Sequence, residues 1–468
     1  MINEKHLKKV NNWLWEIPKE FRADMRVPAR FYSSQKMLGE IFKDRAIEQL
    51  INVATLPGIV KYSLALPDLH EGYGFCIGGV AALDLKTGII SPGGVGYDIN
   101  CGMRLLKSEK QEKEISPYLE KLATKIQERV PSGLGQGQSI KMDINFIDQI
   151  LEKGAQRLVD QGYGQKEDLE NCESQGRLPQ ADPATVSVQA KNRGRDQVGT
   201  LGSGNHFLEI QKVEKIFDPE TAQSFGLFKD QIVIMIHTGS RGLGHQIATD
   251  YLKIMARVMS KYKIKLPDRE LAACPINSSE GKDYFAAMAC GANYAWANRQ
   301  MIAHLIRLAW KDVLGKNSSP LVSLYDVAHN IAKIEKHQVD GQEKELMLHR
   351  KGATRAFPGQ PVLIPGSMGT ASYVLVGKEE GRESWFSVSH GAGRAMSRQA
   401  AARTMSGEKI IKDLKVKGII VKCQSRKGVA EEGPLAYKDI NEVVEIIHNA
   451  GLSKKVARLV PLAVIKGE

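Results

Sequence analysis

Apolar residues along the chain recur with helical spacing in some segments and form short β-branched runs in others. Helical spacing is present at 35–52 and in two stripes within 115–163. The longest helical pattern, at 281–314, is rich in alanine and apolar nearly all round. A helix with apolar residues on every side is buried on every side. We therefore expect a central, largely buried helix at 281–314.

Strands are expected wherever a short apolar run is bounded by turn residues. The run QIVIMIH at 231–237 is heavy in β-branched residues, which predicts a buried strand that ends at His237. Further strands are expected at 75–85, 321–329, 361–366, 371–377 and 418–423. Because helices and strands alternate without a regular βαβ rhythm, we expect a mixed α+β fold and not a doubly wound sheet. No linker divides the chain, so one domain over 1–468 is expected.

Two segments carry no clear period. Residues 1–45 are expected to form an irregular entry ahead of the first helix, and 164–197 are polar and charged. A stretch of this length without its own periodicity is typical of a surface excursion.

Composition indicates a basic globular protein. The chain has 65 Lys and Arg against 53 Asp and Glu, a net charge of +12, which suits a polyanionic partner such as nucleic acid. Basic clusters at 349–355, 394–403 and 415–427 fall in the C-terminal third. Their default interpretation is a solvated charged face, and the alternative is contact with phosphate groups.

The cysteines and the apolar runs together predict where in the cell the protein is located. Six cysteines are scattered without a CxxC pair, which favours a reducing environment. The N-terminus lacks the apolar core of a signal peptide, and no run approaches the ~20 apolar residues that span a bilayer. We expect a cytoplasmic protein without membrane contact.

The stretch GYDINCG at 96–102 sets a carboxylate, Asp98, three residues before a thiol, Cys101, among glycines that allow sharp turns. Carboxylate, thiolate and neutral imidazole ligate divalent transition metals. Four histidines lie beside glycine, asparagine or a strand end, namely His206, His237, His329 and His390. Cysteine with histidine suits Zn, Mn, Fe or Co better than Mg or Ca. The alternative is that Cys101 is a small buried apolar residue and Asp98 caps a turn.

A glycine- and serine-rich turn lies between two expected strands at 363–373, LIPGSMGTASY. Its backbone N–H groups and hydroxyls could bind phosphate oxygens, although most such turns are simple hairpins. The turn is not a Walker A loop, because the lysine of that motif is absent.

Taken together, these motifs resemble the RtcB family of RNA-splicing ligases. The resemblance runs through PDLHEGYG (67–74), GGVGYDINCGMR (93–104), LGSGNHFLEI (201–210), HTGSRGLGH (237–245), NYAWANRQ (293–300), YDVAHN (325–330), PGSMGT (365–370), HGAGR (390–394) and IKG (465–467). It implies a single mixed α/β domain with a central metal- and nucleotide-binding cleft.

The resemblance also implies an activity and its residues. The expected reaction is GTP-dependent and Mn(II)-dependent, with two ions, and it joins an RNA 3′-phosphate or 2′,3′-cyclic phosphate to a 5′-hydroxyl. His390 is implied as the nucleophile that takes GMP from GTP, Asp68 as the carboxylate that orients it, and Cys101 as a bridge between the ions. The implied metal ligands are Asp98, Cys101, His206, His237 and His329. The implied nucleotide contacts are Asn205, Glu209, Asn330, Pro365, Gly366, Ser367, Met368, Gly393, Arg394, Tyr437 and Lys466.

The implied substrates are RNA ends such as tRNA halves, in tRNA splicing and RNA repair, with archease as a further partner. Two other functions remain open from the residues. A two-metal cyclic phosphodiesterase without ligation would use the same ligands but would leave HGAGR and PGSMGT unexplained. A non-catalytic RNA-binding scaffold would hold a structural metal with saturated tetrahedral coordination.

Overall fold

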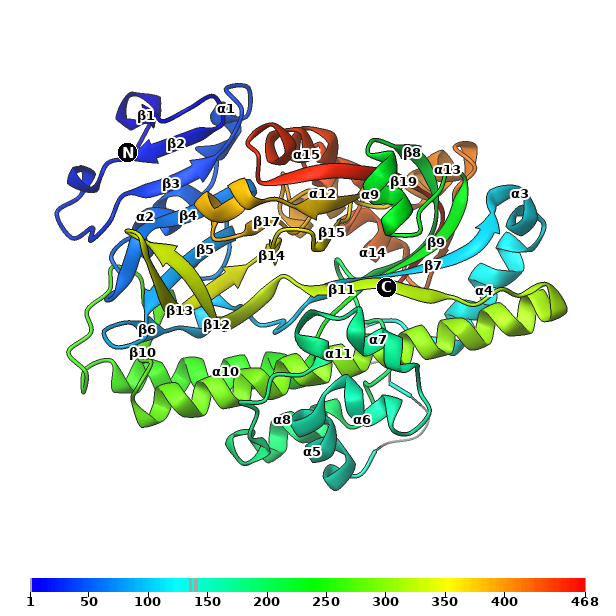
Figure 1. Ribbon diagram of the computed structural model, residues 1–468, viewed down its shortest axis with the longest axis horizontal. Helices are drawn as coiled ribbons and strands as arrows, with labels where there is room; N and C mark the ends of the chain where they lie inside the picture. Colours follow the sequence, from blue (N-terminus) through cyan, green and yellow to red (C-terminus); the bar gives the residue numbers. More distant parts are fainter. Residues whose placement is uncertain (1, 134–136, 139–141, 468) are drawn as a thin grey trace.

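The computed structural model describes residues 2–133, 137–138 and 142–467, and two large sheets lie above one long helix (Figure 1). The first sheet has seven strands, in the spatial order β1 (Lys8–Lys9), β2 (Leu14–Ile17), β3 (Ala29–Tyr32), β4 (Ile59–His70), β5 (Ile77–Asp84), β13 (Gln342–Lys351) and β12 (Asn330–Val339). The second runs β11 (Val322–Ala328), β7 (Gly102–Gln111), β9 (Gln231–Thr238), β8 (Phe207–Ile216), β19 (Ser453–Lys466), β16 (Ser372–Gly377) and β15 (Pro361–Ile364), with β18 (Ile420–Cys423) parallel to β19.

Smaller elements complete the sheets. Two short pairs are β10 (Cys274–Pro275) with β6 (Ile89–Ile90), and β14 (Ala353–Arg355) with β17 (Ser387–Ser389). The two large sheets share apolar cores, because side chains of β4, β5 and β13 pack with those of β15 and β16 in one buried cluster. Helices and sheets are mixed without a βαβ repeat, so the expected α+β class is confirmed.

The predicted central helix is α11 (Ser279–Leu314), 36 residues long and therefore about 54 Å. Ser278 caps its first turn by accepting a hydrogen bond from the Gly281 N–H, and Gly315 ends it with a φ of 55°. Its middle is buried on every side, as its apolar pattern predicted. Helices that pack on it or on each other beneath the sheets are α4 (Leu119–Arg129), α5 (Ile144–Lys153), α6 (Ala155–Val159), α8 (Val188–Gly194) and α10 (Arg241–Val258).

The predicted strands are all present, but the N-terminal expectation is wrong. Residues 1–45 were expected to be irregular, whereas β1, β2 and β3 extend the first sheet. These strands have two to four residues each, too few to display a period of two. The helix predicted at 35–52 is divided into α1 (Leu38–Ile41) and α2 (Ala46–Val53).

The segment 164–197 is not simply a surface excursion. It forms α7 (Lys166–Glu170) and α8, and it buries Asp168 and Glu173. Arg307 Nη2 donates to Asp168 over 2.6 Å, and Lys333 Nζ donates to Glu173 over 3.0 Å. The polar sequence did not predict this burial, because charged side chains are buried only when they are paired. Here the partners lie elsewhere in the chain.

The C-terminal third supplies helices on the other side of the second sheet. They are α12 (Arg398–Thr404), α13 (Gly407–Val416), α14 (Arg426–Glu431) and α15 (Ile440–Asn449), and α3 (Glu112–Ile115) and α9 (Pro219–Ser224) flank earlier strands. The last strand, β19, pairs with β8 so that Lys466 lies opposite Phe207. The chain therefore returns its final residues to the centre of the sheet.

Among the helices that the structure describes, none has the combination of length and apolar character that crossing a membrane requires.

Candidate functional site

One end of four adjacent strands gathers the candidate metal ligands. Along the second sheet the order is β11, β7, β9, β8. His329 directly follows β11, and Cys101 directly precedes β7. His237 is the next-to-last residue of β9, and His206 directly precedes β8.

The strand register makes these side chains neighbours. Gly102 of β7 lies opposite both Thr238 of β9 and Ala328 of β11, and Phe207 of β8 lies opposite His237. Gly102 has no room for a side chain, because a Cβ there would lie 2.4 Å from the Val327 carbonyl oxygen. Antiparallel pairing thus converts four ligands scattered over 229 positions of sequence, from 101 to 329, into one cluster.

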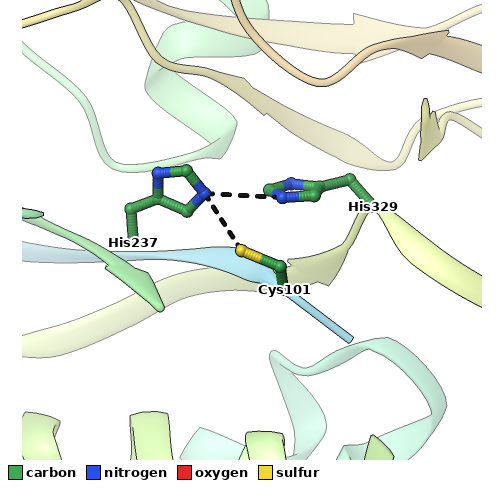
Figure 2. A group of neighbouring side chains, drawn as sticks. All are labelled: Cys101, His237 and His329. Carbon is green, nitrogen blue, oxygen red and sulfur yellow. Dashed lines mark hydrogen bonds between the residues drawn. The ribbon is translucent and has the colours of Figure 1, made fainter. Parts of the chain in front are cut away.

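The cluster consists of two donor groups that share the thiol. Cys101 Sγ lies 3.3 Å from His237 Nε2, which lies 3.4 Å from His329 Nε2 (Figure 2). On its other side Cys101 Sγ lies 3.4 Å from His206 Nε2, which lies 2.8 Å from Asp98 Oδ2. Within each group the ligand atoms lie within 4.8 Å of one another. Cys101 is therefore the member that the two donor groups have in common.

The loop before β7 folds to bring Asp98 and Cys101 together. Gly96 and Asn100 adopt positive φ angles of 96° and 52°, and the Cys101 N–H donates to the Asp98 carbonyl over 3.0 Å. The Ser240 N–H donates to Asp98 Oδ1 over 3.0 Å and leaves Oδ2 directed at His206. The turn that the glycines predicted therefore orients the Asp98 carboxylate toward His206.

The electrostatics of the cluster suit a metal ion. Burial lowers the pKa values of His237 and His329 well below the usual range, so both rings are neutral. Burial opposes ionisation of Asp98, but His206 and its other partners together outweigh burial and lower the pKa of the carboxyl to about 2. Burial and the facing Asp98 raise the pKa of the Cys101 thiol. A carboxylate, a thiol and neutral imidazoles are donors that a transition metal ion binds, with loss of the thiol proton.

Hydrogen bonding supports the same conclusion. The Nδ1 of His206 donates to the Leu201 carbonyl over 3.1 Å, which fixes the ring and leaves Nε2 for a metal. The Nδ1 atoms of His237 and His329 are buried and have no hydrogen-bond partner among the described residues. A neutral ring that keeps its proton on Nδ1 offers the Nε2 lone pair, and the Nε2 atoms of these two rings lie 3.4 Å apart, close enough to bind one cation. The residues present can therefore hold a metal ion.

His390 lies at the edge of this cluster and contacts the carboxylate of Asp68. Asp68 belongs to β4 of the first large sheet, and His390 follows β17, which pairs with β14 in a small sheet. Asp68 Oδ2 lies 2.5 Å from His390 Nδ1 and accepts a second bond from the His390 N–H over 3.1 Å. The rings of His390 and His329 lie 5.0 Å apart between centroids. With Nδ1 donating to Asp68, the Nε2 lone pair is free to attack an electrophile.

A cavity of about 440 Å³ joins these features. Of the candidate site residues, only Asp68 and His206 do not line it, and each of these contacts one that does. The candidate nucleotide residues on its wall are Asn205, Glu209, Asn330, Pro365, Gly366, Ser367, Met368, Gly393, Arg394, Tyr437 and Lys466. The turn at 363–373 is the loop between β15 and β16, as predicted.

Two carboxyl groups on the cavity wall, Glu209 and Glu432, differ in their charge and in their partners. Burial raises the pKa of Glu209 to about 8, so its carboxyl is largely protonated near neutrality and can donate a hydrogen bond. Arg394 Nη1 and Arg398 Nε donate to Glu432 over 3.0 and 2.8 Å, and the Tyr437 hydroxyl donates to the same carboxylate. Glu432 thus fixes three side chains at the rim.

Sequence reasoning missed several residues of the cavity. His70, Tyr97, Lys351, Arg398 and Glu432 line it but were not predicted. Lys351 and Arg398 lay inside noted basic clusters, a signal that was present but not specific. Burial lowers the pKa of Lys351 to about 7, and its ammonium donates to the Tyr73 carbonyl. Glu432 carried no signal, because its role depends on arginines 34 and 38 residues away.

A buried arginine, Arg299 of α11, supports the ligand strands from beneath. Its Nη1 donates to the backbone carbonyls of Asn100 and Thr238, over 2.8 and 2.9 Å, and each of these residues adjoins a candidate metal ligand. Its Nε and Nη2 donate to Asp326, which also accepts from Arg104. One guanidinium therefore ties the end of β9 to the loop before β7.

We expect Arg299→Lys to weaken divalent metal binding by roughly 10- to 100-fold, the range for residues that orient metal ligands. A lysine cannot span both carbonyls and Asp326 at once. Titration of the metal-free protein with Mn(II) measures the effect. Arg307→Lys is the matched control, because Arg307 lies on the same helix and pairs with buried Asp168 away from the ligands. Equal metal affinity for the two variants would contradict this role.

The fold and the site together define a class: an α+β protein with a buried donor group for metal at the floor of a cavity rich in hydrogen-bond donors. The family model described as tRNA-splicing ligase RtcB matches residues 49–467. The chain is 51% identical to a protein of Archaeoglobus fulgidus and 50% identical to one of Thermococcus kodakarensis, each named tRNA-splicing ligase RtcB, over 98% of this chain and 99% of each relative. It is also 50% identical to the RNA-splicing ligase RtcB of Mycobacterium bovis, over 90% of this chain and all of that protein.

The chain belongs to the RtcB family.

Proposed function

We propose that this protein is an RNA ligase that joins a 3′-phosphate or 2′,3′-cyclic phosphate end to a 5′-hydroxyl end, with GTP as cosubstrate. The observation that carries the proposal is the position of His390, held by Asp68 beside the Cys101 cluster within one cavity. The relatives' names agree with a ligase. The substrates follow from the same names, and tRNA halves are proposed, in splicing and in repair.

His390 would act as the nucleophile toward GTP. Its Nε2 lone pair attacks the α-phosphorus, the P–N bond forms, the bond to the β-phosphate oxygen breaks and pyrophosphate leaves. Asp68 keeps the proton on Nδ1 and stabilises the positive ring that results. The product is GMP bound covalently to His390.

The guanylate would then activate the RNA end. A 3′-phosphate is a poor electrophile because its leaving group would be oxide. When an oxygen of that phosphate attacks the phosphorus held by His390, the P–N bond breaks and the RNA end carries GMP. The 5′-hydroxyl then attacks the 3′-phosphate, and GMP leaves with the electron pair. A cyclic phosphate is first opened by water.

Two Mn(II) ions are proposed in the donor groups, with Cys101 as the shared ligand. Asp98, Cys101 and His206 would hold one ion, and Cys101, His237 and His329 would hold the other, since these are the two groups whose donor atoms lie together. When bound, such ions neutralise phosphate oxygens and orient attacking and leaving groups. The protein's own part is to aim the donors, through Ser240 on Asp98 and Leu201 on His206.

The remaining cavity residues are proposed to bind the guanylate. Ser367 and its neighbours on the loop between β15 and β16 offer N–H and hydroxyl groups to phosphate oxygens. The protonated Glu209 carboxyl and Lys466 would contact the base or ribose, and burial lowers the Lys466 pKa. The other proposed contacts are Asn205, Asn330, Gly393, Arg394 and Tyr437, all on the cavity wall.

We also infer that residues 1–468 act as one catalytic unit, because the cavity takes residues from both large sheets, such as Lys351 of β13 and Lys466 of β19. Every cysteine is free, in keeping with a cytoplasmic location. Archease is proposed as an additional partner of this unit.

Incubation with Mn(II) and α-labelled GTP tests the proposal. We expect a covalent, acid-labile guanylate on the protein, and joined products when RNA with 3′-phosphate and 5′-hydroxyl ends is added. Opened but unjoined RNA without protein guanylate would instead indicate a cyclic phosphodiesterase. RNA binding without either product would indicate a scaffold.

A further inference from the structure

The three basic clusters of the sequence do not share one environment. The cluster at 349–355 lies on β13 and β14, and Arg350 and Lys351 are buried. Arg350 Nη1 donates to Glu335 over 2.6 Å. The default expectation of a solvated face is therefore wrong for this cluster, because its cations are paired in the core or line the cavity.

The other two clusters belong to one surface unit, residues 394–438, here named the C-terminal basic unit. Its helices α12, α13 and α14 and strand β18 pack on one another. The unit has 11 Lys and Arg and 4 Asp and Glu, so its net charge is 11 − 4 = +7, against +12 for the whole chain. The unit therefore holds less than a tenth of the chain's residues but more than half of its net positive charge.

Helix α13 shows how the charge is displayed. Ile410 and Leu414 are buried, whereas Lys409, Lys412 and Lys415 are exposed on the opposite side. The cations of the unit that are exposed and make no ion pair with any described residue within 4.0 Å are Arg403, Lys409, Lys412, Lys415 and Lys417. Cations left together without carboxylates repel one another and attract a polyanion.

The unit is continuous with the reaction cavity. Arg394 and Arg398 at its start and Glu432 and Tyr437 near its end all line the cavity. Within the unit α12 packs on α14, α14 packs on α13, and α13 contacts β18, which pairs with β19 of the second sheet. A polynucleotide whose end occupies the cavity can therefore continue onto the exposed cations of α12 and α13.

We propose that the C-terminal basic unit binds the sugar–phosphate backbone of the RNA outside the reaction cavity, without reading its sequence. The proposal rests on the proposed function, since it extends the RNA site. Lysines favour this partner over a protein, because lysine is depleted at protein–protein interfaces. Phosphates need only a row of flexible cations, and contacts of this kind position the nucleic acid.

The test is a quadruple variant, Lys409→Gln, Lys412→Gln, Lys415→Gln and Lys417→Gln, compared with wild type for binding a stem–loop RNA that ends in a 3′-phosphate. We expect at least a 10-fold loss of affinity at about 0.1 M salt. We also expect the slope of log affinity against log salt to become shallower by roughly 3, because each of the four lost phosphate contacts removes about 0.7 to 0.9. Guanylylation of His390 should be unchanged, since none of these lysines lines the cavity.

A matched control removes the same charge elsewhere. Lys253, Lys265, Lys316 and Lys344 are exposed, and none of them appears among the ion pairs of the described residues, so the four Gln substitutions there change net charge equally. The control should retain affinity and salt slope. Equal losses in both variants, or no loss in either, would overturn the proposal. A wild-type protein that binds this RNA but forms no guanylate would instead count against the proposed ligase chemistry alone.

Discussion

Replacing His390 with alanine is expected to abolish the covalent guanylate and to lower RNA joining by on the order of 10⁴-fold or more, as loss of a nucleophile does in other enzymes. The alanine removes the only atom proposed to attack GTP. Metal affinity should change little, because His390 belongs to neither donor group. Labelled GTP measures the guanylate, and Mn(II) titration measures the metal.

Asp68→Asn is the informative companion to that variant. The amide keeps the shape but can present its NH₂ to Nδ1, which would favour the wrong tautomer of His390. We expect slower guanylylation without loss of metal binding. If His390→Ala still formed a stable protein guanylate, the nucleophile would be a different residue and the proposed mechanism would fail.

The second large effect is expected from Cys101→Ser, which should weaken metal binding by at least about 100-fold. The thiol is the shared member of both donor groups, so one substitution removes a ligand from each. A hydroxyl is a poorer ligand for a transition metal, since it does not ionise as a thiol does. Calorimetric titration with Mn(II) gives both affinity and stoichiometry.

Cys423→Ser serves as the control for that change. Cys423 is partly exposed on β18 and belongs to neither donor group. It should bind metal like the wild type, and both variants should unfold at similar temperatures without metal. Two ions bound by Cys101→Ser with unaltered affinity would refute the shared thiol.

The local pattern of residues was sufficient to predict elements whose signal is long or strongly apolar. The helix α11 followed from a long alanine-rich pattern whose middle is buried on every side, and the strand β9 followed from a run of eight residues that are all buried. The strands β1 to β3 were missed because four residues or fewer have no measurable period. The paired charges of Asp168 and Glu173 were taken for surface because their partners, Arg307 and Lys333, are more than 130 residues away.

The candidate site divides in the same way. The sequence by itself determined the inventory of ligand types, the sharp turn between Asp98 and Cys101 and, through its motifs, the family, since these depend on neighbouring residues. The family resemblance also implied a shared Cys101 and an Asp68 that orients His390, but only the tertiary structure gave the distances that join these residues. The tertiary structure alone decided that one basic cluster is buried while two form a surface. The register of antiparallel strands sets such distances, and register is a property of segments far apart in the chain.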